Sequence, residues 1–284
     1  MVNGPRAGYD RRSANAVALP DETSRYRAPA LDKGLDIIEL LAGTDESLSQ
    51  AEIAKALGRS PNEIYRMLDR LVRRNYVVVV NGGRYELTLK LFALAHQHPP
   101  MRRLVSQAVP VMRQFARTTE QACHLAVFDR GSILVVAQVD SPTYWGLSIR
   151  VGARVGLLNT GSGHVLLAFA SAKERAFMLE EREPMEGDQP PSDFERRLAH
   201  IRGDGYEMMD SHQTRGVLNL SVPVLGPDGN AIAALTCPFL SRIDRSDAPG
   251  ARSVIEILKH AGRELSQISG GPAPETSTPS GRSP

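Results

Sequence analysis

Cysteine is scarce in this chain of 284 residues: only Cys123 and Cys237 are present, and neither belongs to a Cys-x-x-Cys or Cys-x-x-His motif. This scarcity argues against a disulfide framework and a zinc finger, and it is typical of a reducing compartment. The sequence also lacks any run of the roughly 18 apolar residues that a membrane span requires, and its N-terminus lacks the hydrophobic segment of a signal peptide. We therefore expect a cytoplasmic protein without membrane contact.

Net charge is small as well. The chain has 34 Lys and Arg against 32 Asp and Glu, which gives +2, and arginine supplies most of the positive charge. A nucleic-acid binder with so little net charge must concentrate its positive charge in a local patch. Hydrophobic residues make up 42% of the chain, enough to bury more than one core. At roughly 100–200 residues per domain, this length indicates two domains.

Two helix-start signals follow one another near the N-terminal third of the chain. Ser49 with Glu52 forms one capping box, and Ser60 with Glu63 forms a second. Gly58 stands between them, where the first helix must end and the chain must turn through a left-handed backbone conformation. Two short helices separated by such a turn predict a helix-turn-helix.

The second helix of this pair separates an apolar face from a polar one. Its apolar stripe consists of Ile64, Leu68, Leu71 and Val72. Its polar face carries amide, phenol and guanidinium groups, which hydrogen-bond base edges and phosphates in the major groove of DNA. The predicted DNA contacts are Gln50, Arg59, Ser60, Asn62, Tyr65, Arg66, Arg70, Arg73 and Arg84. A solvated helix face or a protein-protein module is the alternative, but the local excess of arginine disfavours it.

A β-hairpin signal comes directly after this helix pair. Residues 76–80 and 84–88 are rich in β-formers and are joined by Asn81, Gly82 and Gly83. A helix-turn-helix followed by a hairpin is a winged helix, and the upstream helix with Leu31, Leu35, Ile38 and Leu41 would complete its core. We predict a winged-helix DNA-binding domain over residues 30–88.

The remaining chain divides into a linker and a second domain. Residues 89–100 predict a linker helix that ends at Pro99 and Pro100. Strands are expected near residues 122–128, 133–139, 147–151, 217–225 and 231–238, and helices near 161–170, 173–180, 192–202 and up to Ile268. This order predicts an α+β domain over residues 101–269 with a largely antiparallel sheet.

Both ends of the chain have the composition of disordered segments. Residues 1–29 are rich in Gly, Pro, Arg and Ala without apolar periodicity, and residues 270–284 are of low complexity. We interpret them as a disordered arm and a disordered tail. The alternative for the arginine-bearing arm is that it reaches into a minor groove.

A loop before the first helix of the second domain has the character of an anion site. Asn159 or Thr160 can cap this helix, which leaves the amides of Gly161, Ser162 and Gly163 pointing out of its first turn. A carboxylate there would gain hydrogen bonds and a helix-dipole attraction of about 0.3–1 kcal/mol. The alternative is that these glycines only permit close packing of the helix on the sheet.

Enzymatic motifs are weak throughout the sequence. Cys123 and His124 are neighbours on a predicted strand, so their side chains point to opposite faces and cannot act together as nucleophile and base. The loop before Ser162 lacks both the Gly-x-Ser-x-Gly elbow and a phosphate-cradling Gly-Lys-Ser/Thr. His96 and His98 lack further ligands for a metal. We expect no catalytic residue, cofactor or metal site, and we keep an enzyme or a ligand-free interaction scaffold as the rival classes.

Several short sequence motifs, taken in their order along the chain, resemble those of the IclR family of bacterial transcriptional regulators, and they extend over nearly the whole chain. These motifs are residues 31–41, Tyr65 to Leu68, Gly152 with Ala153, residues 161–168, Gly205 with Tyr206, and Arg215 with Gly216 ahead of Ser221 to Pro223. The resemblance implies a sequence-specific regulator that binds double-stranded operator DNA. It further implies a GAF-like second domain that binds a small-molecule effector, an organic or aromatic acid, and a homo-oligomer that is a dimer or a dimer of dimers.

The resemblance also implies where the effector binds. The corresponding positions are Gly161, Ser162, Met209 or Asp210, Asn219, Thr236 and Pro238, with Leu147 and Ile149 as an apolar wall. The chain departs from the family pattern at Met209, where an acidic residue is usual, at His212, where glutamate is frequent, and at Asn219, where a small residue or cysteine is usual. We therefore expect an effector different from those of the best-known members. The alternative for Asn219 and Thr236 is an ordinary structural role in the sheet.

Overall fold

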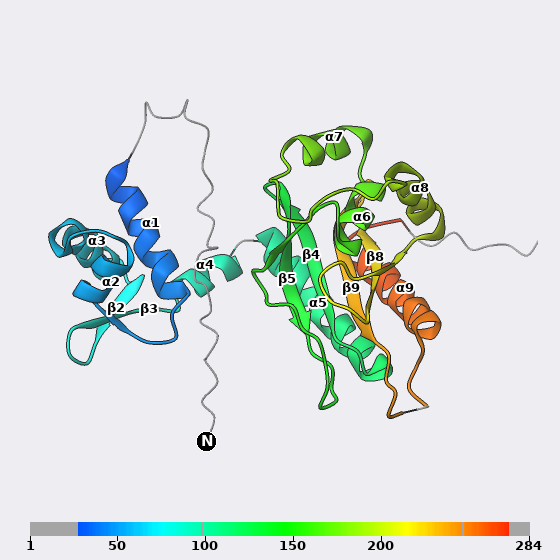
Figure 1. Ribbon diagram of the computed structural model, residues 1–284, viewed down its shortest axis with the longest axis horizontal. Coiled ribbons are helices and arrows are strands. Elements are labelled where there is room, and N and C mark those ends of the chain that lie inside the picture. The colour runs from blue at the N-terminus through cyan, green and yellow to red at the C-terminus, as the bar shows by residue number, and fades with distance from the viewer. Residues whose placement is uncertain (1–27, 98, 246, 273–284) are drawn as a thin grey trace, which may run out of the picture. The chain divides into compact units, whose positions relative to one another are not determined.

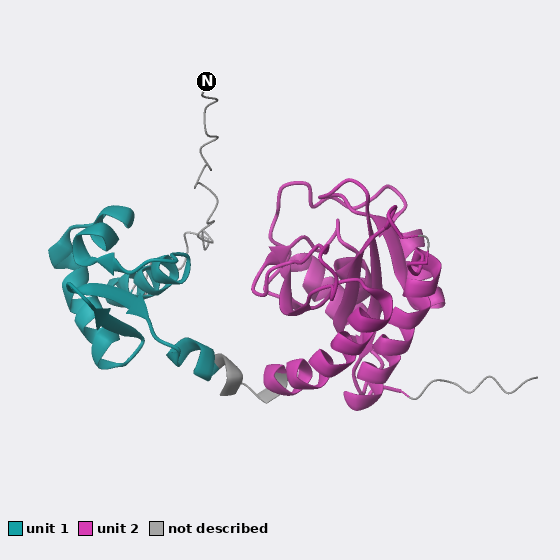
Figure 2. Cartoon of the chain, turned by 90° about the horizontal axis from the view of Figure 1, so that it is seen from below, with its two compact units in different colours: residues 1–97 teal, residues 98–284 magenta. Residues whose placement is uncertain are grey.

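The computed structural model describes residues 28–97, 99–245 and 247–272, which form two compact units, residues 1–97 and 98–284 (Figure 2). Most of the predicted disordered arm and tail, and His98 of the predicted linker, lie outside the described residues. No helix in the described part of the chain is long and apolar enough to cross a membrane.

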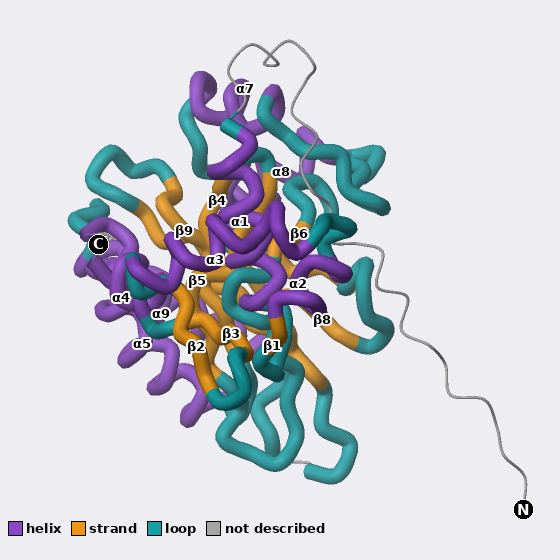
Figure 3. The backbone as a smooth tube through the Cα atoms, turned by 90° about the vertical axis from the view of Figure 1, so that its left-hand side faces the viewer, coloured by secondary structure: helices purple, strands orange, loops and turns teal. Residues whose placement is uncertain are grey.

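The first unit contains three helices, a small three-stranded sheet and a further helix at its end (Figures 1 and 3). Its elements are α1 (Pro29–Ala42), β1 (Leu48–Ser49), α2 (Gln50–Ala56), α3 (Pro61–Arg73), β2 (Val77–Val80), β3 (Arg84–Leu87) and α4 (Lys90–Gln97). Its core consists of Ile37, Leu41, Ile53, Ala54, Ile64, Leu68 and Val77. Helix α1 begins at Pro29, so the last position of the predicted arm is helical.

The turn between α2 and α3 forms as the sequence predicts. The Ser49 side chain accepts from the Glu52 amide, and the Glu52 carboxylate accepts from the Ser49 amide at 2.7 Å. Gly58 has a φ of +63°, and the Arg59 amide bonds back to the Ala54 carbonyl at 2.9 Å, which ends α2 in a glycine-capped turn. The positions of both helices are therefore determined by capping and turn residues that lie close to them in the sequence.

The hairpin is tied to the helix pair through a two-residue strand. β2 pairs with β3 in antiparallel register around the predicted turn, where Gly82 and Gly83 have positive φ. β1 pairs with the other edge of β3, with Ser49 opposite Arg84. Ser49 thus belongs to the sheet and caps α2 at the same time.

The second unit is built around one six-stranded sheet whose order is β6-β5-β4-β9-β8-β7. Its strands are β4 (Cys123–Asp129), β5 (Ser132–Val139), β6 (Arg154–Val155), β7 (Glu207–Asp210), β8 (Val217–Leu225) and β9 (Ala231–Leu240). Every strand pair described in this sheet is antiparallel. The predicted α+β class with a largely antiparallel sheet is confirmed.

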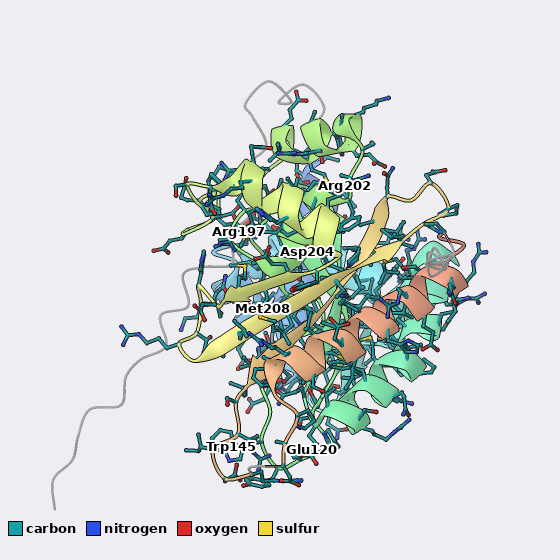
Figure 4. The ribbon with its side chains drawn as sticks, turned by 90° about the vertical axis from the view of Figure 1, so that its right-hand side faces the viewer. Glu120, Trp145, Arg197, Arg202, Asp204 and Met208 are labelled. Atoms are coloured by element: carbon teal, nitrogen blue, oxygen red, sulfur yellow. The ribbon has the colours of Figure 1, made fainter. Side chains whose placement is uncertain are left out.

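Helices cover both faces of this sheet, as Figure 4 shows for α9 on one side and α8 on the other. α5 (Pro99–Thr119) and α9 (Ala251–Ile268) pack on one face, where Met112, Phe115 and Leu258 meet strand residues such as Leu125 and Leu235. α6 (Gly161–Ala168), α7 (Ala172–Glu180) and α8 (Phe194–Asp204) form the other layer over a second cluster that includes Leu157, Leu167 and Ile201. Pro110 lies inside α5 without ending it.

The strand prediction is wrong for one segment and incomplete for three others. Residues 147–151 do not form a strand: the Ile149 amide makes a contact of 3.5 Å to Gln138 Oε1, and pairing with β5 starts only at Gly152. The alternation of Leu147, Ser148 and Ile149 resembles that of a strand, but the segment has no ladder partner in the described sheet. The sequence analysis also missed β1, β6 and β7, which are too short to show a period.

Candidate functional site

The exposed face of α3 presents most of the predicted DNA contacts of the first unit. Asn62, Tyr65, Arg66, Arg70 and Arg73 are all exposed, and Tyr65 is 57% exposed although it is aromatic. A surface hollow of about 500 Å³ is bordered by Tyr65, Arg66, Met67, Asp69, Arg70 and Arg73. The hydrophobic residues of the helix face the core, so the whole polar face is open to a partner.

The arginines of this face differ in their partners. Arg73 donates from Nε to both carboxylate oxygens of Asp69, at 3.0 and 2.9 Å. Arg66 and Arg70 form no ion pair with any residue that the structure describes. These two guanidinium groups are therefore the cations of α3 that a phosphate or a base edge can bind without breaking an existing pair.

Four other predicted DNA contacts are engaged within the unit. Gln50 donates to the Pro61 carbonyl at 2.9 Å, and Arg59 pairs with Asp36 of α1 at 2.8 Å. The Ser60 hydroxyl donates to the Glu63 carboxylate at 3.0 Å. Arg84 donates to the Ser47 carbonyl and pairs with Glu52 at 2.9 Å. These side chains hold the helices and the hairpin together, and their contact with DNA stays a prediction.

A cavity of about 170 Å³ lies in the second unit. It is bounded by the start of α6, the sheet, the segment around Leu147 and the loop before β8. Its lining residues are His124, Leu147, Ile149, Val155, Thr160, Gly161, Ser162, Ser211, Gln213, Thr214, Val217, Asn219, Thr236 and Pro238. The structure thus brings together seven of the positions that the sequence assigned to an effector site: Leu147, Ile149, Gly161, Ser162, Asn219, Thr236 and Pro238.

Two predicted positions are not brought to this cavity. Asp210 stands opposite Leu218 in the β7–β8 ladder, so it projects to the face opposite that of Asn219 and is exposed. Met209 shares a face with its register partner Asn219, but it is buried at 5% exposure and does not line the cavity. The sequence offered both positions as alternatives, and alternation along β7 explains why Asp210 lies on the wrong side.

The start of α6 forms one wall of the cavity. Thr160, rather than Asn159, caps this helix: its Oγ1 accepts from the Gly163 amide at 3.1 Å and donates to the Gly156 carbonyl at 2.7 Å. The close-packing alternative for the glycines is also met, because a Cβ at Gly161 would stand 2.5 Å from Ser221 Oγ. The tight packing brings the first turn of α6 directly over the sheet and beside the cavity.

A chain of hydroxyl groups joins α6 to the sheet. Ser162 Oγ lies 2.9 Å from Thr236 Oγ1, which donates to Ser221 Oγ at 2.8 Å. All three side chains are buried, so these bonds satisfy groups that have no access to bulk water. These linked hydroxyl groups hold the first turn of α6 against β8 and β9.

His124 lines the cavity, although the sequence analysis did not assign it to the effector site. It is 3% exposed, its Nδ1 has no hydrogen-bond partner, and burial lowers its pKa from 6.5 to about 4. Alternation along β4 had separated it from Cys123, and Cys123 does lie in the core beneath α5. The strand alternation of β4 could be recognised in the sequence, but alternation alone does not show which face of the strand borders a cavity.

The lining contains few ionisable groups. None of its residues is Asp, Glu, Lys or Arg, and His124 is its one histidine. Hydroxyl groups, an imidazole, the side-chain amides of Gln213 and Asn219 and the backbone amides at the start of α6 supply the polar contacts, while Leu147, Ile149 and Val155 supply an apolar wall. In the described part of the chain, no group of three or more His, Cys, Asp or Glu side chains is placed to hold a metal ion.

A winged helix with an open basic face, joined to an α+β unit with its own cavity, defines the class of transcriptional regulators that carry a separate ligand-binding domain. The family model described as the C-terminal domain of the bacterial transcriptional regulator IclR matches residues 100–267, and the IclR helix-turn-helix model matches residues 30–80. This chain belongs to the IclR family of bacterial transcriptional regulators. Its helix-turn-helix is the DNA-binding domain and its second unit is the effector domain.

Individual relatives agree with this assignment. The HTH-type transcriptional regulator KdgR of Escherichia coli is 27% identical over 229 residues, which cover 79% of this chain and 86% of KdgR. The IclR crystal structure from Thermotoga maritima has a TM-score of 0.69 at 22% identity and covers 84% of this chain and 98% of that one. An IclR homolog from Microbacterium hydrocarbonoxydans, solved in complex with 4-hydroxybenzoate, has a TM-score of 0.69 at 21% identity with the same two coverages. The structural likenesses show the shared fold.

Proposed function

We propose that this regulator binds operator DNA through the exposed face of α3 and that a small organic or aromatic acid in the cavity beside α6 changes its affinity for that DNA. The observation that supports the effector half most directly is the cavity itself, which places the first turn of α6 next to buried polar groups and an apolar wall. The regulator acts where its DNA is, in the bacterial cytoplasm, and it catalyses no reaction.

The acid is inferred from the chemistry of the lining. The first turn of α6 supplies amide donors at Gly161 and Ser162 and the positive end of a helix dipole, which favour a carboxylate. The apolar wall of Leu147, Ile149 and Val155 suits a hydrocarbon or aromatic body. The relative solved with 4-hydroxybenzoate is an example of an aromatic acid bound to a protein of this fold.

The DNA half rests on charge and exposure. Arg66 and Arg70 have no ion-pair partner among the described residues, and the opposite face of their helix is packed into the core. Tyr65 and Asn62 beside them supply further hydrogen-bonding groups. Guanidinium groups in this position suit guanine edges and phosphates. The hairpin of β2 and β3 would contact the duplex beside the helix.

We infer that the two sites are linked through a homo-oligomer. The effector binds one arrangement of the second units better than another, and the linker segment around α4 passes this difference to a pair of α3 helices. Half-sites on DNA lie about 34 Å apart, so a modest change in the spacing of two such helices lowers affinity.

The test is a thermal-shift screen of organic acids on the purified protein. Every acid that raises the melting temperature is then titrated into a gel-shift assay with the promoter region beside the protein's own gene. We expect at least one acid to stabilise the protein and to change its retention of that fragment. If no genomic fragment is retained in a salt-sensitive way, with or without metabolites, the DNA half of the proposal is wrong.

A further inference from the structure

A row of polar side chains crosses the face of the sheet that α6 covers. Gln138 on β5 stands opposite His124 on β4, which stands opposite Thr236 on β9. Thr236 stands opposite Ser221 on β8, and Ser221 stands opposite Glu207 on β7. Residues opposite one another in an antiparallel ladder project to the same face. A buried sheet face is ordinarily apolar, so a run of five polar positions in register requires a reason.

The other four members of this row have hydrogen bonds within the protein, and Glu207 accepts one from Arg197 at 2.8 Å. Thr236 and Ser221 are joined to one another and to Ser162. Gln138 donates to the Val139 carbonyl at 3.1 Å and accepts the long contact from the Ile149 amide. The hydroxyl of Thr236, which stands opposite His124 in the ladder, is therefore bonded on both sides by other residues.

His124 is the exception in this row. It is buried, as Thr236 and Ser221 are, yet its Nδ1 has no partner and no hydrogen bond to its ring is formed by the residues that the structure describes. Unsatisfied buried polar groups are rare because their desolvation is not repaid. Nδ1 itself is enclosed, but the imidazole borders the cavity, so a bound molecule is placed to bond the other ring nitrogen, which also has no partner among the described residues.

The charge state of this imidazole limits what that partner can be. Since burial holds its pKa near 4, the ring is neutral at physiological pH and offers one N–H donor and one bare nitrogen acceptor. The lining contains no Lys or Arg to balance a charge at this end of the cavity. A second carboxylate would be buried there without a counter-charge, whereas a hydroxyl or oxo group is neutral and matches the ring.

We infer that His124 selects the effector: it hydrogen-bonds a hydroxyl or oxo oxygen of a monocarboxylic acid whose carboxylate lies at the start of α6. This inference rests on the proposed acid-binding function and narrows it to hydroxy and oxo monocarboxylic acids. A site that leaves a buried polar group unpaired discriminates against an analogue that lacks the matching oxygen. Dicarboxylic acids and acids with a purely hydrocarbon body are disfavoured at the same position.

The test measures a ratio of affinities on the full-length protein by isothermal titration calorimetry. The probes are two matched pairs, 4-hydroxybenzoate with benzoate, and mandelate with phenylacetate. The proteins are the wild type, His124→Leu, His124→Gln and the control His260→Leu, in which an exposed histidine of α9 is changed instead. A change in packing alone would shift both members of a pair together, so the ratio reports the hydrogen bond.

We expect the wild type and His260→Leu to bind the oxygenated member of at least one pair roughly tenfold more tightly, as expected for one net hydrogen bond in a buried site. His124→Leu should lose this preference. His124→Gln, whose amide also donates and accepts, should keep part of it, and it carries the test if the leucine variant does not fold.

Equal affinities within both pairs for the wild type, or an unchanged preference in His124→Leu, would overturn the role of His124 while leaving the acid effector intact. If no acid binds the wild type, both the selection by His124 and the acid effector are wrong. The two failures are therefore distinguishable in one set of titrations.

Discussion

At the scale of single residues, the arginines of α3 differ because of the partners that the fold gives them. Arg66 is exposed and has no ion-pair partner in the described part of the chain, whereas Arg73 is bonded to Asp69 on the preceding turn. We expect Arg66→Ala to lower the affinity for the cognate operator by about 1–3 kcal/mol if the side chain contacts a base. Arg73→Ala should weaken all DNA sequences to a similar extent. Gel-shift titrations with operator and scrambled duplexes check both, and no effect of either change would remove α3 from the DNA interface.

Glu63 gives a prediction for pH at the same scale. The Ser60 amide and hydroxyl donate to its carboxylate and Lys33 pairs with it, which lowers the pKa of Glu63 from 4.5 to about 2. A carboxyl group whose pKa is lower in the folded state stabilises that state above its unfolded pKa and stops doing so as the pH falls through the folded pKa. The cap on α3 should therefore weaken progressively between about pH 5 and pH 2.

Thermal melts followed by far-ultraviolet circular dichroism measure this dependence. Glu63→Gln cannot ionise, so its melting temperature should fall less steeply over the same pH interval. Identical pH profiles for the wild type and this variant would show that Glu63 does not contribute.

Single residues also show what the sequence could predict. Local signals such as the Ser49 and Ser60 caps and Gly58 were readable because their partners lie within four positions. The pairing of Arg59 with Asp36 was not, because the two stand far apart in the chain. The lack of a hydrogen-bond partner for the His124 ring in the described structure could not be predicted either, because it depends on which groups the neighbouring hydroxyls bond.

At the scale of elements, α6 packs so tightly that a methyl group added at one of its glycines would displace it. A Cβ at Gly163 would stand 2.1 Å from the Leu157 carbonyl oxygen, whereas a Cβ at Gly203 of α8 meets nothing within 4 Å. We expect Gly163→Ala to destabilise the protein by about 1–3 kcal/mol through overpacking. Gly203→Ala should be neutral or stabilising by up to about 1 kcal/mol, because alanine favours the helix. Denaturant unfolding measures both, and equal free energies of unfolding would contradict the packing argument.

Elements were predictable where a strand or helix is long enough to show its period. β8 and the helices α3 and α9 follow from alternating or helical apolar residues. Residues 147–151 have the same pattern without a neighbouring strand to bond, and β7 has a neighbour but only four residues. Strand formation depends on a partner distant in sequence, and that information is absent from a local pattern.

At the scale of the whole molecule, the two functions belong to separate units with separate cores. Ser162 lines the cavity in the second unit, far along the chain from α3. We expect Ser162→Trp to abolish the change in DNA affinity caused by an effector, because the indole would occupy the cavity, while basal DNA binding stays at the wild-type level. Gel-shift titrations with and without the acid measure this, and an unaltered effector response would remove Ser162 from the site.

The class of each unit and the family followed from the sequence because composition and motifs change together between the two units. The matched family models cover both units and agree with that interpretation. The residues that meet at the cavity come from segments between His124 and Pro238, and only folding brings them together.

Ser49 pairs with Arg84 in the small sheet, and its side chain caps α2. These two roles have a practical consequence for protein engineering. Any graft that moves DNA specificity from one regulator to another must carry residues 48–87 as a single cassette. A splice between the helices and the hairpin would disrupt the antiparallel pairing of Leu48 and Ser49 with β3. The transplanted α3 would then sit at an uncontrolled tilt on its new duplex.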